Sequence, residues 1–380
     1  MRMEMVLLGY LDILNIPALL MLGVVTSYQD FKEGKIRNKW IIISVLYSFF
    51  SLGLTALLLE LGGSTINPVY VKGFFVNLGF SLGFGVFLWM CKLWSAGDAK
   101  LFVAYAALIP LSTYRWQVSP LFPSYILLIN TFTPIFVFLL VRMLFSLKPK
   151  MFLDELKRSL NPKIVLSFAL FIFGFSVIGS LFFRFTGIQP NFVVMILFLF
   201  LVMIFFTNAV KVDLLKVSVV FAVLRLVLDF RQVITLLYWE QFALQFAAFI
   251  ALQYIVLNLG SRAFSRPIYV EELKPGMCLA QDVSEEKDEL RQSSTVSYSY
   301  LQSIFQNFRS KSILSDYSCL SVEDVEKLKK GHSESRLKSH LILIYDKLSF
   351  AAFMFAGAIV TIIVQGDLIA AIRLAVERFI

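Results

Sequence analysis

Long apolar stretches separated by short polar segments dominate the chain, and this pattern predicts membrane-spanning helices. A helix needs about 20 apolar residues to cross the hydrocarbon core of a bilayer. Apolar stretches occur at Val6–Thr26, Trp40–Leu61, Lys72–Cys91, Ala99–Ser112, Ser124–Leu147, Ile164–Phe183, Pro190–Asn208, Val212–Phe230, Thr235–Asn258 and Leu348–Gln365. Two are weaker, because the fourth is short and the eighth carries ionisable residues. We therefore expect an all-α polytopic membrane protein with about nine to ten transmembrane helices.

A polar segment at 261–347 interrupts this pattern before the last apolar stretch. Ile268–Val270 predicts a short strand, Leu273–Gly276 a turn and Val322–Lys330 a charged helix. A segment of about 85 residues can build a small core of its own, so we expect a small α+β domain here. The predicted division is a protease-like membrane core at 1–147, an amphipathic cytoplasmic linker at 148–163, additional membrane helices at 164–260, the polar domain at 261–347, and a final transmembrane helix with its tail at 348–380.

The composition excludes an ordinary soluble protein. Of the 380 residues, 58% are hydrophobic and 16% charged, whereas soluble domains have roughly 45–50% apolar and about 25% charged residues. The three cysteines, Cys91, Cys278 and Cys319, show neither even pairing nor close spacing, which excludes a disulfide scaffold. The net charge is +9, but residues 262–347 carry 13 basic and 13 acidic side chains. The excess therefore lies beside the membrane, where it sets topology and attracts anionic lipid, and it gives no reason to expect a nucleic-acid partner.

The positive-inside rule orients the helices. If every stretch crosses, one side receives most of the basic residues between spans: Lys32, Lys35, Arg37, Lys39, Lys92, Lys100, Arg142, Lys148, Lys150, Lys157, Arg158, Lys163, Lys211, Lys216, Arg262 and Arg266. That side is the cytoplasm, so the amino terminus lies outside and the polar domain inside. If Val212–Phe230 does not cross, the polar domain moves outside and Arg262 and Arg266 violate the rule. We expect a multi-pass protein of the plasma membrane.

Several catalytic classes lack their key residues. Both histidines, His332 and His340, lie in the polar segment, so no histidine within the membrane can serve a serine nucleophile or bind zinc. The chain has no HExxH, no phosphate-binding Gly-x-x-x-x-Gly-Lys-Ser/Thr motif and no CxxC. The two histidines are eight residues apart with no cysteine nearby, and we interpret them as surface residues. We expect neither a metal nor a cofactor.

Two aspartates stand at positions that suggest chemistry. Asp30 directly follows the first apolar stretch, and Asp98 directly precedes the fourth. Counting crossings places both at the cytoplasmic face. Two carboxylates at the same depth on different helices can act as an aspartyl protease, because one takes a proton from water while the other donates to the scissile carbonyl. Such a pair shares a proton and titrates as one unit. The alternative is two interfacial charges that pair with Lys32 or Lys100, and spacing alone does not decide between the two interpretations.

The segments around these aspartates resemble the paired motifs of the type IV prepilin peptidase and preflagellin peptidase family, membrane aspartyl proteases of the GxGD type. In that family an aspartate at the cytoplasmic end of a helix precedes a basic stretch with Ile-Pro-Asn, and a Gly-x-Gly-Asp-x-Lys begins a later helix. Here the first motif runs from Asp30 to Ile36-Arg37-Asn38, and the second is Ser95-Ala96-Gly97-Asp98-Ala99-Lys100. Arg37 and Ser95 depart from the pattern. The resemblance covers roughly residues 6–145.

The resemblance implies an endopeptidase with catalytic Asp30 and Asp98, supported by Gly97 and Lys100. The substrate would be a pilin-like or archaellin-like precursor, cut between its short basic leader and its apolar helix. The chain lacks the paired CxxC ligands of the bacterial relatives, so it resembles the archaeal branch. Lys100 would tune the pKa of Asp98, hold a phosphate headgroup, or only extend to the interface. Glu33 is a candidate for binding the basic leader, and a solvated loop charge is the simpler interpretation.

Two other functions compete with this one. A proton-coupled transporter would use Asp213, Arg225, Asp229 and Arg231, because ionisable groups inside a bundle often mark a pathway. Structural pairing explains Arg225 and Asp229 more simply, since they lie four residues apart on a helix. A catalytically inactive scaffold for pilus assembly would explain the additional helices, but would leave the two aspartate motifs as coincidence. The sequence does not indicate the oligomeric state.

Overall fold

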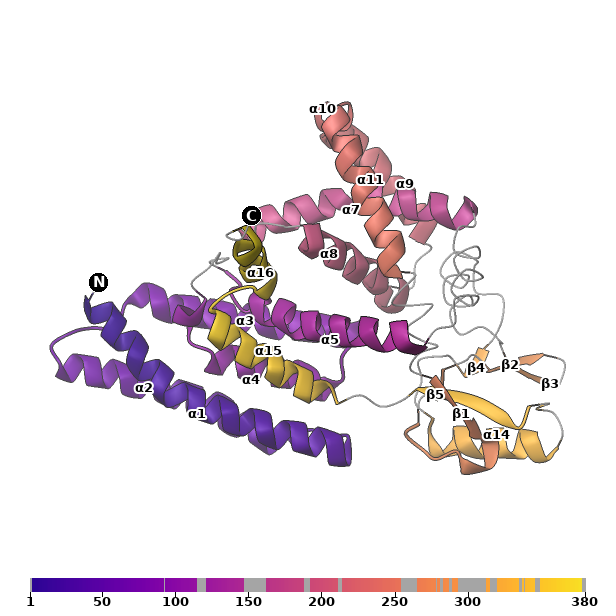
Figure 1. Ribbon diagram of the computed structural model, residues 1–380, viewed down its shortest axis with the longest axis horizontal. Helices are drawn as coiled ribbons and strands as arrows, with labels where there is room; N and C mark the ends of the chain where they lie inside the picture. The colour runs from indigo at the N-terminus through magenta and orange to yellow at the C-terminus, as the bar shows by residue number, and fades with distance from the viewer. Residues whose placement is uncertain are drawn as a thin grey trace. The chain divides into compact units, whose positions relative to one another are not determined.

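The computed structural model of the chain is mostly helical (Figure 1). It describes residues 2–91, 93–114, 121–146, 162–187, 192–210, 214–253, 265–277, 279–280, 283–286, 289–292, 312–314, 320–334, 337, 339–345 and 349–377. The chain divides into two compact units: Met1–Phe138 with Ser180–Asn191 and Leu348–Ile380, and Leu139–Gly179 with Phe192–Lys347. The final helix and its tail, at 348–380, therefore belong to the same unit as the first helices. The linker expected at 148–163 lies outside the described residues, apart from the start of a helix at Pro162.

The first unit contains the helices of the two aspartate motifs. They are α1 (Arg2–Glu33), α2 (Asn38–Leu61), α3 (Pro68–Met90), α4 (Ala96–Leu108), the short 3-10 helix η1 (Leu111–Thr113), the first part of α5 (Tyr125–Ser146), α15 (Phe350–Val364) and α16 (Leu368–Glu377). Local sequence sets several of their ends. At Gly34 the backbone takes φ +62° and the N–H donates to the Asp30 carbonyl, which ends α1. Asn67 caps α3, because its side chain accepts from the Val69 N–H at 2.9 Å and Pro68 follows it.

The short helix α4 is the buried centre of this unit. It packs against α1, α2, α3 and α15, and Leu101, Ala104 and Tyr105 are fully buried. The close approach of α3 depends on Gly85, where a Cβ would lie 3.2 Å from the Ala99 carbonyl oxygen. Because other helices of the unit surround α4, its 13 residues need not meet lipid along their full length.

The last long helix, α15, is inserted tightly beside α1 and α4 (Figure 1). A side chain at Gly23 of α1 would overlap the Phe355 ring, and one at Gly357 would overlap Thr131 of α5. Asn130 of α5 holds the end of α15: its amide donates to Thr361 Oγ1 at 3.0 Å and to the Gly366 carbonyl at 2.9 Å. The position of α15 is thus fixed by contacts along its length.

The second unit contains the other apolar helices. They are the first part of α7 (Pro162–Thr186), α8 (Phe192–Ile204) with the π-helix η2 (Phe205–Val210), α9 (Leu214–Leu228), α10 (Phe230–Val233) and α11 (Leu236–Gln253). Gly174 lets α7 approach α9 closely, since a Cβ there would lie 2.8 Å from the Ser218 carbonyl oxygen.

The polar segment forms a small α+β part of the second unit. Its elements are β1 (Ser265–Tyr269), the 3-10 helix η4 (Val270–Glu272), β2 (Val283–Glu286), β3 (Glu289–Gln292), β4 (Ser312–Leu314), α14 (Val322–Ser333) and β5 (Leu341–Tyr345). β1 pairs antiparallel with β5, and β3-β2-β4 form a second antiparallel sheet. Ser321 and Asp324 cap α14 reciprocally. The segment has its own apolar core, which includes Val270, Leu273, Leu328 and Ile342.

Each predicted apolar stretch coincides with a helix among the described residues, which supports a helical membrane protein. Three of these helices are long and apolar enough to cross a bilayer: Asn38–Leu61, Pro68–Met90 and Val165–Thr186. Shorter apolar helices occur at Tyr125–Ile135, Val194–Ile204 and Phe350–Val364. Membrane association therefore follows from three clear candidate spans together with the apolar composition.

Candidate functional site

Asp30 lies in the last turn of α1 and meets the beginning of α15. Its side chain is half-buried. Oδ2 accepts two hydrogen bonds, from the Ser349 hydroxyl at 2.9 Å and from the Ala351 backbone N–H at 3.2 Å. The carboxylate of Asp30 therefore caps a helix that begins 320 residues later in the chain. An anion is favourable at this place, because the free N–H groups of a helix start carry partial positive charge.

Asp98 lies in the first turn of α4, one residue before the apolar stretch at Ala99–Ser112. Ser95 is the N-cap: its hydroxyl accepts from the Asp98 N–H at 3.2 Å, and Asp98 Oδ2 accepts from the Ser95 N–H at 3.1 Å. This is a reciprocal capping box. Ser95, which departs from the family pattern, thus begins the helix that carries Asp98 and fixes the direction of its carboxylate.

The two carboxylates interact electrostatically. Burial raises the pKa of the Asp98 carboxyl above its ordinary value, the hydrogen bonds with Ser95 oppose this, and the nearby charge of Asp30 raises the pKa further. Both carboxylates therefore belong to one electrostatic site. A pair in which burial and a neighbouring charge favour protonation of one member is the arrangement that acid–base chemistry needs.

Other residues of the two motifs also contact each other. Gly97 packs against Ile36, since a Cβ at Gly97 would lie 3.6 Å from the Ile36 Cβ. Lys100 Nζ donates to Asn38 Oδ1 at 3.2 Å. Two contacts thus join motifs that lie more than 60 residues apart in sequence. The contact with Asn38 gives Lys100 a structural role between the two motifs.

An aromatic cluster joins the starts of α4 and α15. The Trp94 ring lies 5.5 Å from those of Phe102 and Phe350 and 6.2 Å from that of Phe132, measured between ring centroids. Trp94 immediately precedes the N-cap of α4, and Phe350 immediately follows Ser349. Two helix N-termini are therefore held side by side, each with one aspartate.

Glu33, the candidate for binding a basic leader, is paired within the protein. The Arg37 guanidinium donates to both of its carboxylate oxygens, at 2.8 and 3.2 Å. The pair is exposed, so it contributes little to stability. Arg37, the other departure from the family pattern, also donates its backbone N–H to Gln29 Oε1 at 3.3 Å, which ties the loop after α1 to the helix.

The second unit buries a different charge. Arg225 of α9 is 5% exposed. Its guanidinium donates to the Phe173 carbonyl at 3.2 Å and lies over the rings of Phe173 and Tyr238. Among the described residues no ion pair joins Arg225 to Asp229, the pairing that the spacing suggested, although the backbone N–H of Asp229 donates to the Arg225 carbonyl. Asp213 lies outside the described residues.

The two histidines meet in the polar domain. His332 lies in the last turn of α14 and His340 just before β5, and their ring nitrogens Nε2 and Nδ1 are 3.3 Å apart. Sequence spacing did not indicate this contact, because it arises from the return of the chain from α14 to β5. In the part of the chain that the structure describes, no group of three or more histidine, cysteine or acidic side chains could hold a metal ion.

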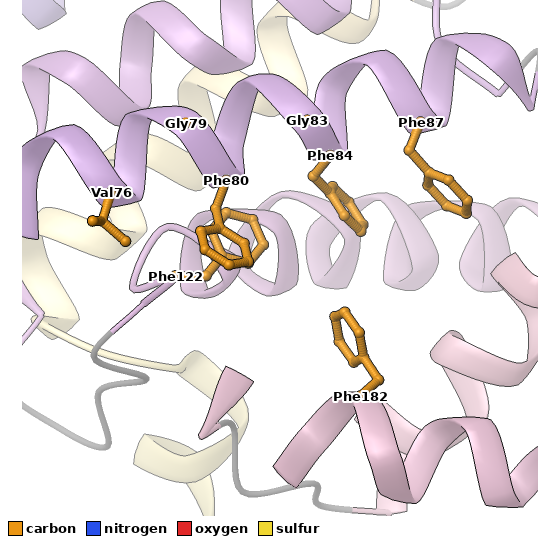
Figure 2. A pocket seen from close by; sticks show the side chains of 8 residues that line it. All are labelled: Val76, Gly79, Phe80, Gly83, Phe84, Phe87, Phe122 and Phe182. Carbon is orange, nitrogen blue, oxygen red and sulfur yellow. The ribbon is translucent and has the colours of Figure 1, made fainter. Parts of the chain in front are cut away.

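The first unit also has a pocket, lined by apolar residues of α3 and two further phenylalanines (Figure 2). Figure 2 shows Phe80, Phe84 and Phe87 of α3 on one side, with Phe182 of α7 pointing toward them. The volume is about 520 Å³, and no lining residue is ionisable. The pocket therefore has no group that could act as an acid, a base or a nucleophile, and the aspartate site is the better candidate for chemistry.

Sequence reasoning did not identify Ser349, which bonds directly to Asp30. A serine at the beginning of the last apolar stretch is a visible N-cap signal, but nothing in the sequence indicates which carboxylate it meets. Comparison with known proteins gives no independent guide: no protein-family model, no curated protein and no solved structure matches this chain.

Proposed function

We propose that this protein is an intramembrane aspartyl endopeptidase that removes the short basic leader from type IV pilin-like or archaellin-like precursors at the cytoplasmic face of the plasma membrane. One observation carries the proposal: two distant motifs meet so that the charge of Asp30 acts on the half-buried carboxyl of Asp98. The motif resemblance supplies the substrate class.

The two aspartates take different roles in this proposal. Asp30 is the general base, because two donors at the start of α15 stabilise its negative charge. Asp98 is the general acid, since burial and the charge of Asp30 favour its protonated form. Asp30 takes a proton from the attacking water, and Asp98 donates its proton to the carbonyl oxygen of the scissile peptide bond. Neither step requires a metal or a cofactor.

The proposed topology has about nine to ten membrane spans, with the aspartates and the polar domain at 261–347 in the cytoplasm. The basic residues at the ends of the helices support this orientation through the positive-inside rule. A precursor with a cytoplasmic leader and an apolar helix in the bilayer would then present the junction between them at the depth of Asp30 and Asp98.

A second candidate function is a catalytically inactive scaffold for pilus assembly. The bonds from Ser349 and Ala351 to Asp30 favour it, because a carboxylate that caps a helix has a structural role without any catalysis. The peptidase proposal predicts that Asp30→Asn keeps the contact with α15 but abolishes cleavage, whereas a scaffold has no cleavage to lose. An asparagine keeps an oxygen that can accept from the helix start but cannot act as a base.

The test is cleavage of a tagged pilin-type precursor in proteoliposomes that contain the purified full-length protein. The products are identified by amino-terminal sequencing. We expect leader removal by the wild type, none by Asp30→Asn or Asp98→Asn, and wild-type cleavage by the control Glu33→Gln, which removes a nearby charge outside the dyad. Variants that fold in detergent and cleave normally would exclude the altered aspartate from catalysis, and an inactive wild type would favour the scaffold.

A further inference from the structure

Ser349 occupies the N-cap position of α15 but does not cap its own helix. Its backbone is extended, with φ −73° and ψ 100°, and its side chain makes no capping bond to the N–H groups that follow. An N-cap serine ordinarily accepts a hydrogen bond from the second or third N–H of its helix. Here the hydroxyl donates to Asp30, and the Ala351 N–H donates to the same carboxylate oxygen.

This arrangement engages only one oxygen of Asp30. The Ser349 hydroxyl and the Ala351 N–H both donate to Oδ2, and among the described residues no donor bonds to Oδ1. A carboxylate held through one oxygen by charge-assisted bonds has a defined orientation and keeps its other oxygen for a further partner. In a dyad that partner would be the attacking water. The charge of Asp30 acts on Asp98 of α4, whose pKa it raises.

The helix that presents Ser349 is itself firmly placed. Phe350 packs on Trp94, next to the start of α4. Farther along α15, the Phe355 ring lies against Gly23 and Gly357 lies against Thr131. The hydroxyl of Ser349 is therefore positioned by the packing of the whole helix.

We propose that Ser349 is a positioning residue of the peptidase: its hydroxyl holds Oδ2 of Asp30 so that Oδ1 faces the water shared with Asp98. This inference rests on the proposed peptidase function. It also gives the last membrane helix, α15, a role at the catalytic site, although this helix lies outside both aspartate motifs.

The experiment compares Ser349→Ala, Ser349→Thr and Ser349→Gly in the full-length protein, with kcat and KM of precursor cleavage as readouts. Loss of a hydrogen bond to a charged group lowers kcat about tenfold with KM unchanged. Threonine keeps the hydroxyl and retains activity near that of the wild type. Glycine keeps a favourable N-cap without the hydroxyl, and behaves like alanine.

The matched control is Ser48→Ala, which removes a buried hydroxyl that bonds only to a carbonyl within α2. It leaves kcat unchanged. An active wild type with unchanged kcat in both Ser349→Ala and Ser349→Gly would overturn the role of Ser349 and leave the peptidase proposal standing. Equal losses in Ser349→Ala and Ser48→Ala would also overturn it. A wild type that leaves the precursor uncut would overturn both.

Discussion

The two units of the protein hold charge among apolar helices in opposite ways. In the first, two half-buried carboxylates on separate helices interact with each other and with the N-termini of α4 and α15. In the second, the buried Arg225 lies over the rings of Phe173 and Tyr238 and donates to a backbone carbonyl. Like charges brought together cost free energy unless they share a proton, whereas a cation among aromatic rings is stabilised where it lies. The first arrangement suits chemistry and the second suits structure.

The largest expected effect is on the cleavage rate, which we expect to depend on the charge in the first unit and not on that in the second. Asp98→Asn lowers the rate of precursor cleavage by roughly 10²–10⁴-fold, the usual contribution of a general acid. Asparagine can still accept from the Ser95 N–H, so α4 keeps its cap. Asp229→Asn in the second unit leaves the rate unchanged. Initial cleavage rates in proteoliposomes measure both variants, and equal losses in the two would end the distinction between the regions.

The next largest effect is on the stability of the folded protein. Replacing a helical glycine by alanine is expected to destabilise the protein in the tightly packed α15 and to stabilise it in α2. Gly357→Ala places a Cβ against Thr131 and destabilises the folded protein by about 1–3 kcal/mol. Gly53→Ala in α2 meets nothing within 4 Å and stabilises it by roughly 0.5–1 kcal/mol, because glycine is a poor helix former. Thermal unfolding in detergent measures both variants. Stabilisation by Gly357→Ala would mean that α15 is not packed closely against α5.

The pH dependence of stability tests the environment of Asp98. Burial raises its folded-state pKa above the unfolded value of 3.8, so the folded protein binds the proton more tightly. The resulting stability is fully present below pH 3.8 and is lost as the pH rises through the folded-state pKa. Asp98→Asn has no such proton, so it becomes more stable relative to the wild type as the pH rises. Unfolding curves over this range measure the difference, and the opposite trend would mean that the carboxylate is better stabilised in the folded protein.

The smallest effect is expected at Arg225. Arg225→Met removes a cation–π contact and one hydrogen bond, but it also removes a buried charge whose Nε has no partner among the described residues. The losses and the gain nearly cancel, so the free energy of unfolding changes by no more than about 1 kcal/mol. Cleavage stays at the wild-type rate. A variant that folds but loses cleavage as completely as Asp98→Asn would make Arg225 part of the functional site.

The helices could be predicted from sequence because burial in lipid leaves a continuous apolar signal. Trp40–Leu61 was predicted and α2 runs from Asn38 to Leu61; even the short fourth stretch is a helix, α4. For the two aspartate motifs, the sequence predicts only that Asp30 and Asp98 lie at the same face of the membrane. It does not predict that the motifs contact each other. The bonds from Ser349 and Ala351 to Asp30 could not be predicted, because they join residues about 320 positions apart through packing that no local pattern records. The same holds for the aromatic partners of Arg225, where spacing suggested Asp229.

A double-variant cycle of cleavage rates tests most directly whether Asp30 and Asp98 act as one unit. The wild type, Asp30→Asn, Asp98→Asn and the double variant are compared in single-turnover reactions with the same precursor. If the aspartates share one proton and one water, each single variant loses nearly all activity, and the double variant is no slower than either. Losses that multiply in the double variant, or a single variant that keeps substantial activity, would contradict the dyad.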